Sequence, residues 1–293
     1  MKIKDNKIPA NNKNIAICFM VAHCFFMSLG TVLLKLMQFD YHITQIMFFY
    51  NLLLCVTLLC LSFFGRNSLR ISCANIKYHF LRSIFGFGGF VLFFYSLSNM
   101  PINEVRAIIS LDPILTALFA VLFFQESINR MKMISFITTF IGAIILLHPE
   151  NIQLSTGAIT SLLAAISFGI YNNVTKKITT GKTIDQIFYL SLFSLLYTTI
   201  PAIYYWNPII KLQDIFLIFG IAILFMLSSI TVFHAFKRAE LSLIMPIHFL
   251  GVVMTAILGF LYFDEKIGYF TIIGTFVITI GMMPLFLKRS GNT

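Results

Sequence analysis

The chain has 293 residues, of which 58% are hydrophobic and only 11% are charged, and its mean hydropathy is +0.89. A soluble domain carries about 25% charged residues, and no soluble core of this length could bury so much apolar side chain. The composition therefore excludes a soluble globular protein and indicates a chain that crosses a lipid bilayer several times. In such a chain the net charge of +10 is better explained by loop charges that orient the protein than by nucleic-acid binding.

Ten apolar segments of spanning length follow one another with short connections. Open strands cannot satisfy their backbone in lipid and the segments are too long for barrel strands, so we predict an all-α integral membrane protein with ten transmembrane helices. The basic N-terminal stretch runs into an apolar segment too long for a signal-peptide core, so we expect a retained first span. The predicted spans are residues 14–35, 42–64, 77–98, 101–124, 131–147, 156–176, 185–206, 212–235, 242–263 and 267–287.

The distribution of positive charge supports this count. With both termini placed in the cytoplasm, 16 Lys and Arg residues fall in inside segments and 3 fall outside, namely Lys35, Lys211 and Lys266. Arg82 and Arg106 fall within spans. Cytoplasmic loops of membrane proteins carry an excess of Lys and Arg, so the sequence predicts a multi-pass protein with cytoplasmic N- and C-termini.

A 49-residue stretch occurs twice. Residues 94–142 align without a gap on residues 233–281 at an offset of 139, and residues 43–46 align on residues 184–187 at an offset of 141. We therefore predict a first five-helix repeat at residues 14–147 and a second at residues 156–287. Since five is odd, the second copy enters the membrane from the opposite side. Such an inverted repeat is a recurrent plan of secondary transporters, which alternate access around a central site.

Motifs of enzymes and of metal or nucleotide sites were sought along the whole sequence. The five cysteines show no CxxC spacing, and four of them lie in apolar runs, so they are expected to be small hydrophobic residues. The chain has no HExxH, no GxGxxG after a strand and no Walker-type loop. We therefore expect no enzyme activity, no metal and no cofactor, and a transporter would be driven by a substrate or ion gradient.

The repeated motifs resemble those of the drug/metabolite transporter superfamily, EamA type. In the first half FFYSLSNMP leads to LDPILTALFAVLFFQESI and FIGAIIL; in the second, AFKRAELSLIMPI leads to LGFLYFDEKI and FVITIGMM. The resemblance covers nearly the whole chain and implies two halves of five helices and a secondary carrier. The turn Phe124-Gln125-Glu126 departs from the family pattern, because it lacks the usual Gly.

Two further stretches, AAISFGIYNNVTKK and YWNPIIKLQDIFLIFG, are similar to those of S-adenosylmethionine uptake transporters of intracellular bacteria. The resemblance implies a small-molecule substrate and a bacterial inner membrane, with uptake of S-adenosylmethionine as its most specific version. An exporter of amino acids or drugs on the same fold is the alternative, and a membrane-embedded enzyme or sensor is disfavoured by the inverted repeat. Monomer and homodimer both stay open.

Asp112 is the first candidate for a substrate contact. It lies about 11 residues into its predicted span, roughly at the bilayer midplane, and is followed by Pro113, which removes a backbone hydrogen bond. A carboxylate beside a broken helix suits a cation or ammonium site. The alternative is a structural ion pair with Arg106 or Arg82. Arg106 could also hold a substrate carboxylate or extend to the outer interface, and Arg82 could be an anchor or a ligand.

Two histidines form the second group of candidates. His248 follows the helix-breaking Pro246 by two residues, and His23 lies near mid-depth of the first span. Both are predicted proton-relay residues, because imidazole titrates near neutral pH, and His248 is also a substrate-binding candidate; hydrogen-bonded packing is the alternative. Further polar residues expected to line the substrate route are Asn51, Tyr171 and Asn172.

Four residues that match between the repeats are expected to be structural. Glu126 and Glu265 each lie at a turn between the last two helices of a half, where a carboxylate can cap the N-terminus of the next helix. Gly142 and Gly281 match within the last helix of each half and are expected to allow close packing.

Overall fold

The computed structural model describes residues 10–37, 40–64, 75–99, 105, 108–147, 155–178, 182–209, 211–263 and 268–287. Within these ranges the backbone forms helices and loops, and no strand occurs. The helices are α1 Ala10–Met37, α2 Ile43–Phe64, α3 Ile76–Asn99, α5 Asp112–Phe124, α6 Arg130–Leu147, α7 Thr156–Lys177, α8 Thr183–Tyr204, α9 Leu212–Arg238, α10 Leu241–His248, α11 Leu250–Phe263 and α12 Tyr269–Leu287.

Seven helical segments of the described chain are long and apolar enough to cross a membrane: α1, α2, α6, α7, α8, α9 and the α10–α11 pair. Helices suit this environment because all backbone hydrogen bonds close within the segment. Many large apolar side chains are exposed, including Phe63 at 84% and Ile200 at 78%, as expected for surfaces that face lipid. The helices α5 and α12 are shorter apolar segments, and α3 is not among the seven.

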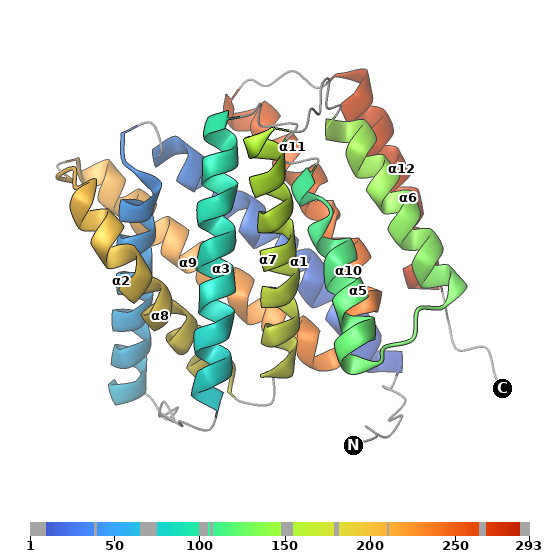
Figure 1. Cartoon of the computed structure of the whole chain (residues 1–293), viewed down its shortest axis with the longest axis horizontal. Helices are drawn as coiled ribbons and strands as arrows, with labels where there is room; N and C mark the ends of the chain where they lie inside the picture. The colour runs from blue at the N-terminus through green and yellow to red at the C-terminus, as the bar shows by residue number, and fades with distance from the viewer. Residues whose placement is uncertain are drawn as a thin grey trace.

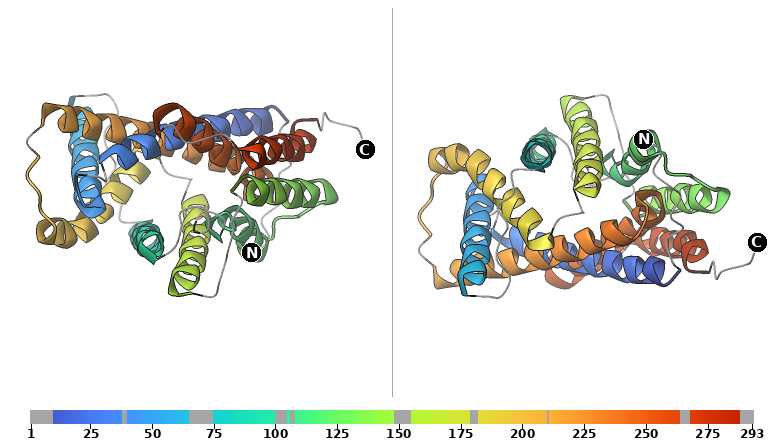
Figure 2. Two further views of the ribbon diagram at one scale, coloured as in Figure 1. Left: turned by 90° about the horizontal axis from the view of Figure 1, so that it is seen from above. Right: turned by 90° about the horizontal axis from the view of Figure 1, so that it is seen from below.

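Eight helical units form a closed ring. Around it, α9 packs on α1, α1 on α11, α10 on α5, α5 on α7, α7 on α3, α3 on α8, α8 on α2, and α2 on α9, with α10 and α11 counted as one unit. Seen along the helices, α3, α7 and α5 form one wall and α1 and α9 the opposite wall (Figure 2). The pair α6 and α12 packs at one end of this arrangement (Figure 1).

The ring has the symmetry expected of two matching halves. The repeat pairs α1 with α7, α2 with α8, α3 with α9, α5 with the α10–α11 unit and α6 with α12. When each element is exchanged for its counterpart, the contact α1–α9 becomes α7–α3, and α5–α7 becomes the contact of the α10–α11 unit with α1. Three further contacts, α2–α8, α5–α10 and α6–α12, each join an element to its own counterpart, so the exchange leaves them unchanged. The contacts around the ring and the α6–α12 pair are therefore preserved by a two-fold exchange of the halves.

Glycines let α6 and α12 cross closely. A Cβ added to Gly142 would stand 2.8 Å from the backbone nitrogen of Ile278, and one added to Gly281 would stand 2.9 Å from the backbone nitrogen of Thr139. The two contacts are equivalent in the repeat, because Gly142 matches Gly281 and Thr139 matches Ile278 at the offset of 139. Since the partner number rises as the α6 number falls, the two helices run antiparallel. Both predicted structural glycines thus lie at one crossing point between the halves.

Two predicted spans differ from continuous helices. The segment 242–263 is divided at Phe249 into α10 and α11, with Pro246 inside α10. Proline has no N–H to donate to the preceding turn, which favours a break nearby. In the segment 101–124, a turn at residues 110–111 precedes α5, and Pro113 lies in the first turn of that helix. Both prolines therefore lie beside a helix interruption near the ring interior.

Candidate substrate cavity

A cavity of about 390 Å³ lies within the ring. This volume lies in the range of known small-molecule sites, about 300–1,000 Å³. Matching parts of both halves line it: residues 47–54 of α2 and 187–194 of α8, and residues 109–113 and 248–252. Several aromatic side chains form part of its wall, among them Tyr50, Phe90, Phe168 and Phe225. Such a wall suits planar or cationic groups, through stacking and cation–π contacts.

Asp112 forms an acidic end of this cavity. Its carboxylate Oδ1 accepts hydrogen bonds from Thr116 Oγ1 at 2.9 Å and from Asn172 Nδ2 at 3.2 Å. The neighbouring Asn173 donates to the backbone oxygen of Thr116 at 3.0 Å, which fastens α7 to α5. Among the described residues, none donates a hydrogen bond to Oδ2 of Asp112. One carboxylate oxygen is thus held by two side chains, while the other has no hydrogen-bond donor among the described residues.

Arg82 does not neutralise Asp112. The ion pairs between described residues are Lys132–Glu240 and Lys211–Asp40. The Arg82 guanidinium instead donates from Nη2 to the backbone oxygen of Gln186 at 2.6 Å, and Arg82 does not line the cavity. The predicted contribution of Arg106 falls outside the described residues.

His23 and His248 line the cavity together. Their ring centroids are 5.8 Å apart. His23 Nδ1 lies 2.8 Å from the hydroxyl oxygen and 3.0 Å from the carbonyl oxygen of Ser228. This places the two predicted proton-relay imidazoles side by side at the junction of α1, α9 and α10, where a change of charge on one would act on the other.

The remaining predicted polar residues also reach the cavity. Asn51, Tyr171 and Asn172 are all among the lining residues. The Asn51 side-chain nitrogen donates to the backbone oxygen of Met47 at 2.8 Å within its own helix, and this hydrogen bond fixes the orientation of the amide. The predicted polar side chains on α1, α2, α5, α7 and α10 therefore line one cavity.

A second polar cluster was missed from the sequence. Ser28 Oγ donates to the backbone oxygen of Gly251 at 3.2 Å, and Thr255 Oγ1 donates to the same oxygen at 2.8 Å and lies 3.2 Å from Ser28 Oγ. All three line the cavity. At the offset of 139, Thr255 matches Thr116 and Gly251 matches Asp112. The identical Thr pair was the available signal: each Thr joins its helix to the first helix of the other half.

Glu126 has a different partner from the predicted one. Its two carboxylate oxygens accept from the backbone N–H groups of Leu241 at 3.0 Å and Ser242 at 2.9 Å, at the start of α10 in the other half. The next helix, α6, is capped by Asn129, whose side chain accepts from the backbone N–H of Lys132 at 2.9 Å. Asn129 therefore caps α6, and Glu126 caps the N-terminus of α10 in the other half. Its repeat counterpart, Glu265, lies outside the described residues.

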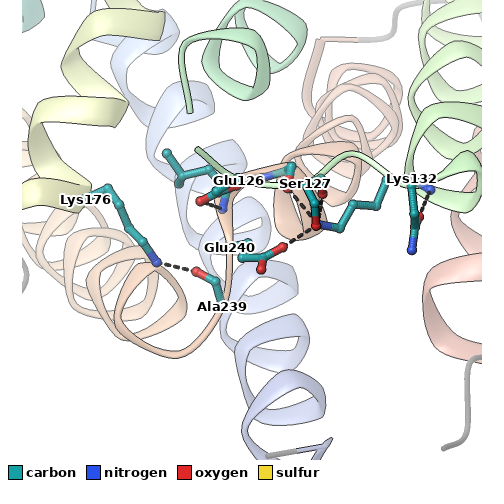
Figure 3. Close-up of polar contacts among 9 residues, drawn as sticks. Glu126, Ser127, Lys132, Lys176, Ala239 and Glu240 are labelled. Carbon is teal, nitrogen blue, oxygen red and sulfur yellow. Dashed lines mark hydrogen bonds and ion pairs between the residues drawn. The ribbon is translucent and has the colours of Figure 1, made fainter. Parts of the chain in front are cut away.

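The surroundings of Glu126 form a polar network between the halves (Figure 3). Lys132 donates to the backbone oxygen of Ser127 at 2.8 Å and pairs with Glu240. From the opposite side, Lys176 at the end of α7 donates to the backbone oxygen of Ala239, just after α9. The network ties the α5–α6 connection, the end of α7 and the α9–α10 connection together.

The sequence pattern of the EamA-like transporter family matches residues 14–148 and matches again at residues 155–287. The chain belongs to the EamA-like transporter family. It is therefore a membrane transporter by family, with two repeats of the family domain.

Curated relatives of this EamA-like protein carry different substrate names. The S-adenosylmethionine uptake transporter of Rickettsia bellii is 27% identical over 74% of this chain and 74% of its own. That of Rickettsia prowazekii is 24% identical over 89% of this chain and 89% of its own. A pseudopaline exporter of Pseudomonas aeruginosa is 22% identical over 80% of this chain and 84% of its own. A solved structure described as "Crystal structure of protein" superposes with a TM-score of 0.77 over 95% of this chain and 99% of that chain, at 13% identity, which shows a shared fold.

Proposed function

We propose that this protein is a secondary active transporter that takes up S-adenosylmethionine across a bacterial inner membrane. Asp112 carries the proposal, because one of its carboxylate oxygens has no protein donor among the described residues and it lines a cavity that several aromatic side chains also line. A buried acid in a membrane protein is costly and usually functional. S-adenosylmethionine offers a sulfonium and an ammonium group to a carboxylate, and a flat adenine to aromatic side chains.

The architecture supports an alternating mechanism. Seven segments meet the spanning criterion, and α3, α5 and α12 complete ten spans in our proposal, with both termini in the cytoplasm. The two-fold exchange of helix contacts and the antiparallel α6–α12 crossing support inverted halves. In this arrangement the cavity opens alternately to the two sides as the halves rearrange around it.

Liposome counterflow tests the proposal. Purified protein is reconstituted with unlabelled S-adenosylmethionine inside, and entry of labelled S-adenosylmethionine is followed. We expect accumulation in wild type and its loss in Asp112→Asn. Absence of accumulation in wild type, with a folded protein recovered from the liposomes, would overturn the proposed substrate.

Export is the second candidate function. The pseudopaline exporter matches 80% of this chain and is named for the opposite direction of transport. Uptake into whole cells separates the two: cells that make the protein accumulate labelled S-adenosylmethionine if it is an importer. Faster loss of a preloaded metabolite from those cells would favour the exporter.

A further inference from the structure

Arg82 is a buried cation with unused donors. Its side chain is fully buried, and only Nη2 has a hydrogen-bond partner, the backbone oxygen of Gln186. Nε and Nη1 have none, and no described acid forms an ion pair with it. The guanidinium carbon lies 5.3 Å from the centroid of the Phe233 ring, a cation–π contact that leaves these N–H groups without acceptors. Buried donors without acceptors are unfavourable unless a ligand or a second conformation supplies an acceptor.

An unused acceptor accompanies these donors. Gln186 donates from its side-chain amide to the backbone oxygen of Ile178 at 2.5 Å, but its Oε1 has no partner. Its repeat counterpart, Gln45, has both amide atoms engaged: Nε2 donates to the backbone oxygen of Asn207 at 2.5 Å and Oε1 accepts from the backbone N–H at 3.0 Å. The Gln186 amide therefore has an oxygen without a partner, whereas both amide atoms of its counterpart Gln45 are engaged.

Arg82 lies directly behind the cavity wall. One turn further along α3, Gly86 lines the cavity, and a Cβ added there would stand 3.2 Å from the Tyr171 ring. Tyr171 lines the cavity, and so does Ile187, which follows the Gln186 whose backbone oxygen accepts from Arg82. Because residues four apart on a helix share a face, Arg82 lies on the face of α3 that meets the Tyr171 ring at Gly86.

Consecutive residues of α7 face two different neighbours. Tyr171 meets α3 at Gly86, one turn from Arg82, and Asn172 donates to Asp112 at 3.2 Å. Successive side chains of a helix point about 100° apart, so the buried cation of α3 and the buried acid of α5 lie toward two adjoining sides of α7. A ligand with one negative and one positive group would be complementary to this pair.

We propose that Arg82 is the carboxylate subsite of the transport cavity and selects substrates with an α-amino-acid head group. A displacement of the Tyr171 ring exposes the guanidinium, whose donors then bind the two carboxylate oxygens. The free Oε1 of Gln186 is available to the neighbouring ammonium group. This inference rests on the proposed function, since S-adenosylmethionine has such a head group, and it adds a second charged contact to that of Asp112.

Two probes that differ only in the carboxylate test the subsite: S-adenosylmethionine and its decarboxylated form. Half-saturation concentrations are measured for both by competition in liposome counterflow. The variants are Arg82→Gln and Arg82→Lys, with Lys77→Gln as a control, because Lys77 is an exposed cation in the first turn of the same helix. Size-exclusion chromatography in detergent checks that each variant is folded.

We expect wild type and Lys77→Gln to prefer S-adenosylmethionine by about 10- to 100-fold, the usual range for charge-assisted hydrogen bonds. Arg82→Gln should transport both probes equally well. Arg82→Lys should retain a smaller preference for S-adenosylmethionine, since Lys keeps the positive charge but cannot make the two parallel hydrogen bonds of a guanidinium. If Arg82→Gln discriminates as wild type does, or wild type does not discriminate, the subsite is overturned and the proposed transport stands. If wild type moves neither probe, both proposals are overturned.

Discussion

The Asn172 side chain donates a hydrogen bond to the Asp112 carboxylate at 3.2 Å and so joins the first helix of the second half to α5 of the first. The equivalent junction in the other half has no charge: Thr255 meets Ser28 at 3.2 Å beside Gly251. Two matching junctions therefore face one cavity, and only one of them carries an acid. A substrate that contacts both junctions would bind in a single orientation, because only one junction offers a negative charge.

Replacement of Asp112 by Asn is expected to lower transport about 10- to 100-fold while the protein still reaches the membrane, because the substrate cation loses its charged acceptor. Liposome counterflow measures this. The matched control is Asp214→Asn: Asp214 is a buried acid that accepts from Tyr41 at 2.6 Å and does not line the cavity. Equal transport by the two variants would remove Asp112 as a substrate contact.

Replacement of Glu126 by Ala is expected to destabilise the protein by about 1–2 kcal/mol, since two backbone N–H groups at the start of α10 lose their acceptor. Glu126→Gln keeps an acceptor and should cost less. Thermal unfolding in detergent measures both. Asp40→Ala is the control, because it removes only an exposed ion pair with Lys211, worth about 0–1 kcal/mol. An unchanged unfolding temperature in Glu126→Ala would contradict the capping role.

Replacement of Gly142 by Ala is expected to destabilise the protein by about 1–3 kcal/mol, because the new methyl group meets the backbone of α12 at Ile278 and Gly274 as well as the Ile278 side chain. Gly88→Ala provides the control within a helix, since a Cβ there meets nothing within 4 Å. That change should be neutral or stabilising by up to about 1 kcal/mol. Similar unfolding temperatures for the two variants would show that the α6–α12 crossing tolerates separation.

Reporter fusions test the ten-span arrangement. Fusions in the connections at residues 66–77 and 177–184 should be active on the cytoplasmic side, and a fusion at residues 148–155 should be active outside. Positive charge concentrated in the segments placed inside is the reason for this expectation. A fusion at residues 148–155 that is active in the cytoplasm would rule out the odd number of spans per half on which the inversion depends.

Much of the helical architecture could be predicted because lipid imposes a simple rule on local sequence. Any segment that crosses a bilayer must close its backbone hydrogen bonds internally and be apolar over its length. The predicted segment 42–64 thus corresponds to α2 at Ile43–Phe64, and 131–147 corresponds to α6 at Arg130–Leu147. Asp112, His23 and His248 could be selected for the same reason, since buried ionisable groups are costly in this setting.

The sequence by itself determined the membrane class, the repeat, the EamA resemblance and a set of polar residues that line one cavity. The partners of these side chains come from the tertiary structure: Glu126 caps a helix more than 100 residues away, Ser28 meets Thr255, and Arg82 donates to the backbone oxygen of Gln186 instead of pairing with Asp112. The reason is physical. Helix formation in lipid depends on neighbours along the chain, whereas these contacts depend on how two antiparallel halves pack, and local patterns do not carry that information.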